Sequence, residues 1–241
     1  MERFEARIVM AGIVLMLLAA CAGSQPPASG NGEASSPLPS PSSPPAPIPE
    51  GQSLMDPGSY LAHVEPNAVI TTTTPWYGAA NAPGFVDFGQ LDHFPYAELM
   101  LLNLDEVIER PADPGDPLKT VPAPDELFTW FLRSGAEVVG EPITFEIDGY
   151  EARQADLRIG PETECAPKST RPWPEACLLI FTIEGDAPVF ALSGPGMMYR
   201  VVVLPHVDGR TVTIIYSDYA KNFPDRVQVA DQVIRSITFD A

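Results

Sequence analysis

The sequence predicts an α+β fold, with an antiparallel sheet and two packed helices in a single domain over residues 55–241. The first observation is a pair of Asp-Gly dipeptides, at 148–149 and 208–209, each between segments that alternate apolar and polar residues. This pattern is typical of a β-hairpin closed by a two-residue turn. The second observation is that two other segments repeat apolar residues at helical spacing. Several strands with few helices among them favour an antiparallel sheet with helices packed on it.

The two predicted helices cover residues 124–135 and 224–235. In the first, Pro124 takes the first helical position, acidic residues fill the first turn, and Gly135 ends the helix. Its apolar face consists of Leu127, Phe128, Phe131 and Leu132. The apolar stripe of the second consists of Val227, Ala230, Val233 and Ile234.

The predicted strands alternate apolar and polar residues or are continuously apolar. The first hairpin pairs 143–147 with 154–159, and the second pairs 199–204 with 211–216. Further strands are expected at 69–74, 98–103 and 178–181. The last of these is apolar throughout, which predicts burial on both of its faces.

Residues 1–20 have the composition of a signal peptide. The apolar run 8–20 would form a helix of roughly 20 Å, against a hydrocarbon core of about 30 Å. Such a run is short for a membrane span and suits the apolar region of a signal peptide. One departure is that Glu2 and Glu5 offset the charges of two arginines ahead of the run.

The segment Leu18-Ala19-Ala20-Cys21 resembles the lipobox of bacterial lipoproteins. The resemblance implies cleavage before Cys21, a diacylglyceryl group on its thiol, and an extracytoplasmic chain anchored to a membrane by lipid. An uncleaved anchor helix and an ordinary secretory signal, with Cys21 coincidental, are the alternatives.

Residues 21–54 are dominated by Pro, Ser and Gly, with Leu38 and Ile48 as the large aliphatic side chains of 22–50. This composition predicts a disordered tether, because too little apolar surface is present to offset the entropy of ordering. A Pro-rich ligand for a binding module and an O-glycosylated stalk are the alternatives.

The domain itself resembles those of uncharacterised lipoproteins of high-GC bacteria. The resemblance is carried by PGSY at 57–60, Trp76, TWFL at 129–132, PITFEIDGYEARQADLRI at 142–159, and VDGRTVTIIYSDYAKNFPDRVQVADQVIRSITF at 207–239. The last third is also similar to PsbP-like α/β sandwiches. Neither resemblance implies a catalytic residue.

Cys165 and Cys177 form an even pair in a chain that we expect to be exported, which predicts a disulfide. Closing a loop of this length contributes roughly 3 kcal/mol to stability. Two free thiols remain an alternative. So does a redox pair, although such pairs usually take the form Cys-x-x-Cys, which is missing here.

A formal net charge of −18 argues against nucleic acid or an anionic membrane surface as a direct partner. No Gly-x-Ser-x-Gly motif is present, and His63, His93 and His206 lack zinc-ligand spacing. The acidic loop at 113–117 lacks the pattern of a calcium loop. We therefore expect no metal and no cofactor, and predict no catalytic residue.

The candidate ligand-binding residues are the aromatics Trp76, Tyr77, Phe94 and Tyr96, in a stretch rich in Pro, Gly and Asn. Aromatics on loops often line binding surfaces, although they also cap the ends of sheets as ordinary core. The predicted function is a non-catalytic binding module of the cell envelope, anchored through lipid, with a protein, a glycan or a small molecule as its ligand. An extracytoplasmic hydrolase with a carboxylate site and an assembly factor of an envelope complex are the alternatives.

Overall fold

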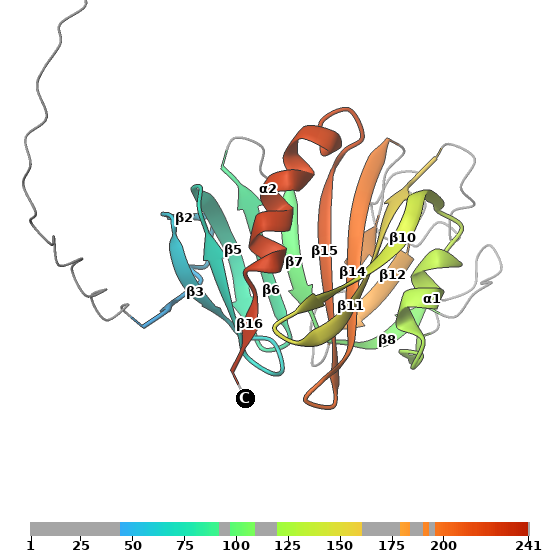
Figure 1. The fold of residues 1–241 in the computed structure, drawn as a ribbon, viewed down its shortest axis with the longest axis horizontal. Helices are drawn as coiled ribbons and strands as arrows, with labels where there is room; N and C mark the ends of the chain where they lie inside the picture. The colour runs from blue at the N-terminus through green and yellow to red at the C-terminus, as the bar shows by residue number, and fades with distance from the viewer. Residues whose placement is uncertain are drawn as a thin grey trace, which may run out of the picture. The chain divides into compact units, whose positions relative to one another are not determined.

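The computed structural model describes residues 44–91, 97–108, 120–160, 179–183, 190–192 and 196–240. These residues form sixteen strands and two helices, so the fold is β-rich. The prediction of an α+β domain is therefore wrong. The fold differs from the prediction because further strands, and not only helices, cover both faces of the main sheet (Figure 1).

The main sheet has eight strands, and every neighbouring pair is antiparallel. Their order is β10 (Glu137–Ile147), β11 (Tyr150–Arg158), β14 (Met197–Val207), β15 (Arg210–Tyr219), β7 (Glu98–Leu102), β6 (Phe85–Gln90), β5 (Trp76–Ala82) and β2 (Ser53–Met55).

Both predicted hairpins are confirmed, as β10–β11 and β14–β15. Asp148 and Gly149 have φ angles of 49° and 81°, and Asp208 and Gly209 have φ angles of 48° and 81°. A type I′ turn requires positive φ at both central residues, and Asp-Gly supplies it at low cost. The turn chemistry thus fixes the register of the four strands that form one half of the main sheet.

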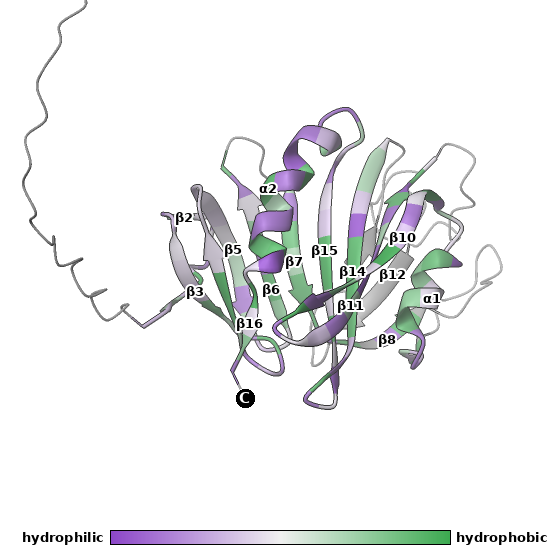
Figure 2. Ribbon diagram, in the orientation of Figure 1, coloured by the Kyte–Doolittle hydropathy of each residue, from purple (hydrophilic) through white to green (hydrophobic). Residues whose placement is uncertain are grey.

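One face of the main sheet carries α2 (Phe223–Arg235) and a second sheet. The order of that sheet is β1 (Ala46–Pro47), β3 (Gly58–Ala62), β4 (Ala68–Thr72) and β16 (Thr238–Phe239). Polar and apolar residues alternate along α2 in Figure 2, and its apolar side packs on the sheet through Phe223, Val227, Ala230, Val233 and Ile234. The predicted helix 224–235 is confirmed.

The opposite face carries α1 (Leu127–Leu132) and a third sheet. The order of that sheet is β13 (Phe190–Leu192), β12 (Leu179–Ile183), β8 (Leu104–Ile108) and β9 (Thr120–Pro122). The helix begins three residues later than predicted, with Glu126 as its N-terminal cap, so Pro124 does not hold its first position. Leu127, Phe128 and Phe131 are buried as predicted. No helix among the described residues has the length and apolar character needed to cross a membrane.

The described chain begins within the segment whose composition predicts a tether. Residues 46–47 and 53–55 form strands, and the Ile48 side chain is 2% exposed in the main core. Leu61 C=O accepts a hydrogen bond from Ile48 N–H at 3.3 Å. The signal peptide, Cys21 and the linker up to residue 43 lie outside the described residues, so their assignments remain predictions.

Gly78 provides a test of this N-terminal packing. A Cβ atom at Gly78 would lie 2.0 Å from the backbone oxygen of Pro49, which requires the backbone to move. We expect Gly78→Ala to lower the free energy of unfolding by about 1–3 kcal/mol, as overpacking does. Urea denaturation of this variant and of Gly58→Ala, where the nearest atom is 3.7 Å away, measures the difference. Equal stability of the two variants would contradict the packing of Pro49 on β5.

Candidate functional site

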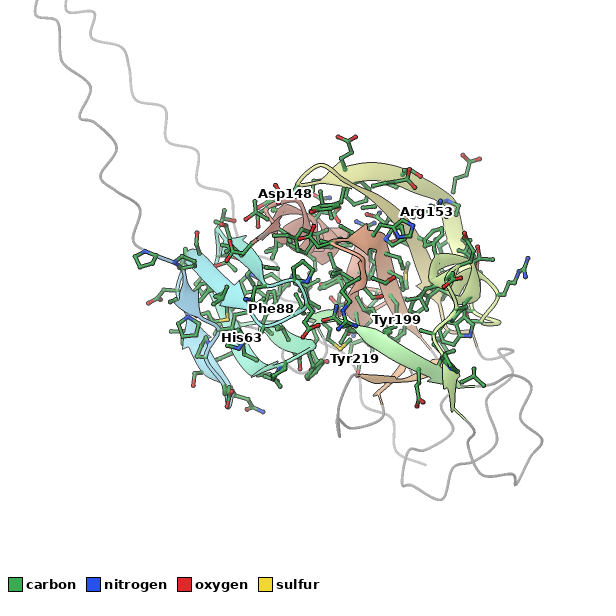
Figure 3. All side chains as sticks on the ribbon, turned by 90° about the horizontal axis from the view of Figure 1, so that it is seen from below. His63, Phe88, Asp148, Arg153, Tyr199 and Tyr219 are labelled. Carbon is green, nitrogen blue, oxygen red and sulfur yellow. The ribbon has the colours of Figure 1, made fainter. Side chains whose placement is uncertain are left out.

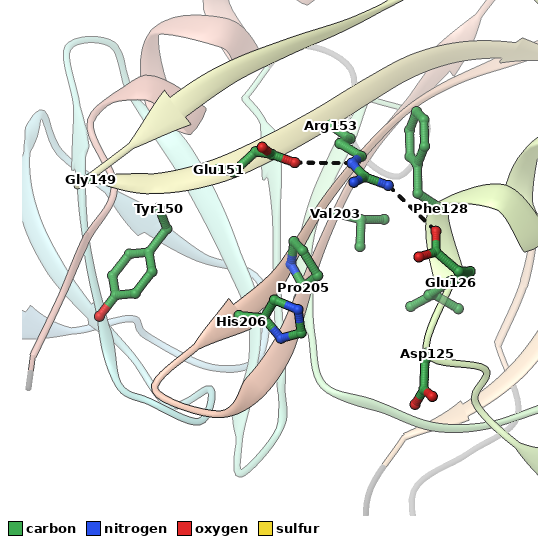
Figure 4. Close-up of a pocket in the computed structure, with 11 residues that line it drawn as sticks. Asp125, Glu126, Phe128, Gly149, Tyr150, Glu151, Arg153, Val203, Pro205 and His206 are labelled. Atoms are coloured by element: carbon green, nitrogen blue, oxygen red, sulfur yellow. Dashed lines mark hydrogen bonds and ion pairs between the residues drawn. The ribbon is translucent and has the colours of Figure 1, made fainter.

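A cavity of about 310 Å³ lies where the start of α1 faces the ends of the two hairpins (Figure 4). We call it the hairpin pocket. It is lined by Asp125, Glu126, Leu127, Phe128, Gly149, Tyr150, Glu151, Arg153, Val203, Pro205 and His206. Its volume falls at the lower end of the range of small-molecule sites, which is roughly 300–1,000 Å³.

The core and the turns position the walls of this pocket. Leu127 and Val203 are both 2% exposed and anchor the start of α1 and the strand β14 in the core beneath the pocket. At the hairpin ends, the Tyr150 hydroxyl donates to Asp208 Oδ1 at 2.9 Å, and this hydrogen bond raises the pKa of Tyr150. The Tyr150 ring also packs edge-on against Phe239, with centroids 5.7 Å apart. The pocket is therefore supported by the fold on two sides.

Arg153 provides the positive charge in the hairpin pocket, and two carboxylates hold it. Its Nε donates to Glu151 Oε1 at 3.1 Å, and its Nη1 donates to Glu126 Oε2 at 3.4 Å (Figure 4). A guanidinium has five N–H groups, so three remain after these two bonds. Arg153 thus offers hydrogen-bond donors in a fixed direction, while its charge is already balanced.

The hairpin pocket has an excess of negative charge. Three carboxylates, from Asp125, Glu126 and Glu151, stand against the single guanidinium of Arg153, so these four groups together carry −2. Asp125 is exposed and makes no ion pair with another of the described residues. A ligand that brings a positive charge to Asp125 would offset this excess.

A smaller cavity of about 240 Å³ continues the hairpin pocket and shares Asp125 and Leu127 with it. Its other lining residues are Asn103, Leu104, Ala123, Pro124, Gly209, Arg210 and Thr211. Arg210 is paired with Glu65, with Nη2 2.7 Å from Oε2. Asp125 thus lines both the hairpin pocket and the smaller cavity.

A second polar cluster lies elsewhere, on the face of the main sheet opposite α2. The pairing register places Tyr77, Glu98, Ser217 and Tyr199 in one row across the sheet, because Gly89 pairs with both Tyr77 and Glu98, and Ser217 pairs with both Glu98 and Tyr199. Asp87 lies on the same face, two residues before Gly89. We call Asp87 and Glu98 the carboxyl pair.

The two acids of the carboxyl pair hold their protons unusually tightly. Burial raises the pKa of Asp87 from 3.8 to about 7. Burial, and then the neighbouring Asp87, raise the pKa of Glu98 from 4.5 to about 8. Among the described residues, no hydrogen-bond donor reaches the buried Oδ1 of Asp87. Neither acid lines either of the two cavities described above.

The four aromatics predicted to bind a ligand do not form one site in the described residues. Trp76 is fully buried in the core, with its ring edge-on to Phe88 at 5.1 Å between centroids. It therefore has no surface for a ligand. Tyr77 is half-buried on the opposite face, in the row that contains Glu98. Phe94 and Tyr96 lie outside the described residues.

The other predicted site residues are also only partly described. Cys165 and Cys177 lie outside the described residues, so the disulfide remains a prediction, and so does His93. Figure 3 shows His63 across the molecule from Arg153, whose pocket contains His206. No group of three or more potential metal ligands occurs among the described residues.

Sequence reasoning missed both the hairpin pocket and the carboxyl pair. The pocket combines the acids before α1 with two turns that were predicted separately, and sequence alone did not bring them together. The carboxyl pair had a local signal in Phe85-Val86-Asp87-Phe88, because an acid within a run that is apolar on both faces is expected to be buried.

Among solved structures, the chain is similar to LpqN, which is involved in cell envelope biogenesis of Mycobacterium tuberculosis. The two are 11% identical, the match covers 80% of this chain and 86% of LpqN, and the TM-score is 0.29. A TM-score this low does not establish a shared fold or a shared function. No protein-family model matches the chain, and no curated protein sequence does.

Proposed function

We propose that the protein is a lipid-anchored, extracytoplasmic binding module of the cell envelope. Its hairpin pocket takes a small hydroxylated molecule that carries a positive charge. The observation that carries this proposal is a supported cavity of about 310 Å³ with three carboxylates against one guanidinium. The size of the cavity falls within the range of small-molecule sites, and its charged lining suits a polar ligand that carries a positive charge.

The chemistry of the ligand follows from the groups that line the pocket. The Asp125 carboxylate has no ion-pair partner among the described residues and suits an ammonium group. The remaining N–H groups of Arg153 suit hydroxyl or carbonyl oxygens. Half-buried Pro205 and Tyr150 give the pocket apolar surface against which a sugar-like ring can pack. Amino sugars combine these features.

The anchor in this proposal is Cys21, and its support is the lipobox sequence Leu18–Cys21. Two or more acyl chains give stable membrane attachment, whereas one gives only marginal binding. Labelled fatty acid is expected to enter the protein through Cys21 and to be lost in Cys21→Ser. Label retained by the Cys21→Ser variant would contradict the anchor without affecting the pocket.

The pocket is tested by titrating the full chain with glucosamine and with glucose. The two sugars differ by an amine in place of a hydroxyl, so they isolate the positive charge. We expect weak binding of glucosamine, with a Kd on the order of 1 mM, and still weaker binding of glucose. Asp125→Asn is expected to weaken glucosamine about tenfold, the effect of losing roughly 1.4 kcal/mol of binding free energy.

Glu141→Gln is the matched control, because Glu141 is exposed and does not line the pocket. Chemical-shift changes in the NMR spectrum report both affinity and location. Equal binding of the two sugars, or equal binding by wild type and Asp125→Asn, would refute the proposed ligand class.

The second candidate function is an extracytoplasmic hydrolase that uses the carboxyl pair. The observation in its favour is that Asp87 and Glu98 both have pKa values raised toward neutrality, as acid–base catalysis requires. Hydrolysis of p-nitrophenyl glycosides or esters by the wild type, and its loss in Glu98→Gln, would favour this function. If the wild-type protein hydrolyses none of these substrates, the hydrolase function is rejected and binding remains the proposed function.

A further inference from the structure

Among the described residues, the outermost strand of the main sheet has one edge that pairs with no other strand. β10 stands at one end of the strand order, with β11 as its single neighbour among the described strands. An edge strand presents unpaired N–H and C=O groups that can pair with another chain. We call the outer side of residues 143–147 the β10 edge.

The pairing register identifies which backbone groups point outward. Ile147 and Tyr150 flank the two-residue turn, whose closing hydrogen bond makes them a hydrogen-bonded pair. Hydrogen-bonded and non-hydrogen-bonded pairs alternate along an antiparallel ladder. Thr144 and Glu146 therefore direct their N–H and C=O groups away from β11. Two residues with this orientation suffice to pair a short added strand.

The first part of β10 is protected against such pairing, and the last part is not. Gly140 has a φ of 77°, Pro142 has no N–H group, and the register shifts between Val139 and Ile143. Bulges and prolines are common means of blocking an edge strand. The register is regular from Ile143 to Ile147, and no such device occurs there.

The β10 edge has one apolar face and one acidic face. Ile143 is 44% exposed and lies on the same face as Phe145, whose ring has Arg235 at 4.5 Å from its centroid. On the other face, the exposed Glu146 is directly opposite Glu151 of β11. Glu151 is already paired with Arg153 of the same strand, whereas Glu146 has no ion-pair partner among the described residues. A basic side chain on an added strand, beside Glu146, would supply that partner.

We infer that the β10 edge binds an extended segment of another protein, in which apolar and basic residues alternate. Backbone hydrogen bonds to Thr144 and Glu146 provide the attachment, an apolar side chain covers Ile143, and a Lys or Arg pairs with Glu146. A second copy of this chain does not fit, because its own edge would bring Glu141 and Glu146 against the same acids and the chain carries a net charge of −18. This site is separate from the hairpin pocket, since none of residues 143–147 lines that cavity.

The test is calorimetric titration of the full chain with the capped peptide Lys-Val-Lys-Val-Lys-Val-Lys. We expect a Kd on the order of 100 µM in low salt, and no binding of the same peptide N-methylated at alternate amides. Thr144→Pro removes an outward N–H group while the bonds to β11 remain, so it is expected to weaken binding at least about tenfold. Thr144→Ala, which retains that N–H group, is the matched control and is expected to bind as wild type does.

Glu146→Lys tests the charge and is expected to weaken binding about tenfold, with Glu50→Lys as the control for net charge. Should Thr144→Pro fail to fold, Glu146→Lys and the methylated peptide decide the outcome. The inference is overturned if wild type shows no binding at 1 mM peptide, or if Thr144→Pro binds as Thr144→Ala does. It is also overturned if sedimentation shows self-association that Thr144→Pro abolishes, because the occupant would then be a second copy.

Discussion

Arg200→Met is expected to lower the free energy of unfolding by about 3–5 kcal/mol, the range found when one partner of a buried ion pair is removed. Arg200 is 9% exposed, and two carboxylates hold its guanidinium. Its Nε and Nη2 donate to the two oxygens of Asp156, both at 2.7 Å, and its Nη1 donates to Asp231 at 2.5 Å. Methionine fills much of the same volume but leaves both aspartates without their cation.

This ion-pair cluster joins three parts of the fold, which is why its loss is costly. Asp156 of β11 is directly opposite Arg200 of β14, and Asp231 lies on α2. The guanidinium also lies 5.9 Å from the ring centroid of Phe223, the first residue of α2. The cluster therefore fixes the position of α2 on the main sheet, beside its apolar contacts.

The matched control is Arg210→Met. Arg210 is also 2.7 Å from its partner Glu65, but their side chains are 47% and 55% exposed, against 11% and 20% for Arg200 and Asp156. Exposed pairs of this kind typically contribute less than about 1 kcal/mol. Urea denaturation, followed by far-ultraviolet circular dichroism, measures both variants. Equal destabilisation by the two substitutions would show that burial does not determine the strength of the Arg200 cluster.

The triple variant Arg200→Met, Asp156→Asn and Asp231→Asn separates two sources of this effect. If the cost comes from leaving carboxylates without a cation, removing their charges is expected to restore most of the lost stability. If the cost comes from the positioning of α2, the triple variant stays as unstable as Arg200→Met alone.

The parts of the fold that could be predicted from the sequence are those set by local chemistry. The turns at 148–149 and 208–209 need positive φ angles, and the Asp-Gly dipeptide alone indicates this conformation. The helix at 223–235 has a complete apolar stripe over more than three turns. By contrast, β1, β2 and β16 have two or three residues each, so tertiary pairing and not their own sequence makes them strands.

The predicted fold class was wrong for the same reason, because strands that form only through tertiary pairing were not expected. The covers of the main sheet were expected to be helices, yet α1 has only six residues and two small sheets share the task. Residues 44–54 were expected to be part of the tether because they continue a segment, 21–54, that is dominated by Pro, Ser and Gly. Ile48 is nevertheless buried there, and composition averaged over a window hides a single anchoring side chain.

The hairpin pocket depends on contacts between distant residues, so the sequence did not reveal it. Arg153 contacts Glu126 across 27 residues, and this contact requires that α1 pack on the end of β11. The candidate ligand-binding aromatics show the reverse case, in which the sequence indicated a site that the structure does not form in the described residues. Trp76 has the residue type of a binding site, but its position on an inward face of β5 places it in the core. Residue type alone did not distinguish the two roles.

The stability of the wild-type protein is expected to fall as the pH rises from about 5 to about 8. Burial raises the pKa of Asp87 from 3.8 to about 7 and, with Asp87 as the second cause, the pKa of Glu98 from 4.5 to about 8. In this window the folded carboxyl groups hold protons that the unfolded chain has released, so the folded state binds more protons. Stability then decreases with pH, the reverse of the usual behaviour of carboxylates. With these values the two carboxyl groups lose about 3 kcal/mol each, so the full loss across the window is on the order of 6 kcal/mol.

Asp87→Asn is expected to remove part of this pH dependence for two reasons. Asparagine has no proton to lose, and because it is uncharged it no longer raises the pKa of Glu98. Thermal unfolding at pH 5 and pH 8 measures the slope, with the exposed Glu50→Gln as control. The Asp87→Asn variant should be more stable than wild type at pH 8 and close to it at pH 5. Since the carboxyl pair shares one environment, adding Glu98→Gln is expected to gain less than the sum of the two single substitutions. A wild-type stability that rises with pH over this window, or an unchanged slope in Asp87→Asn, would mean that the carboxyl pair is ionised in the folded protein and cannot serve as a proton-holding site.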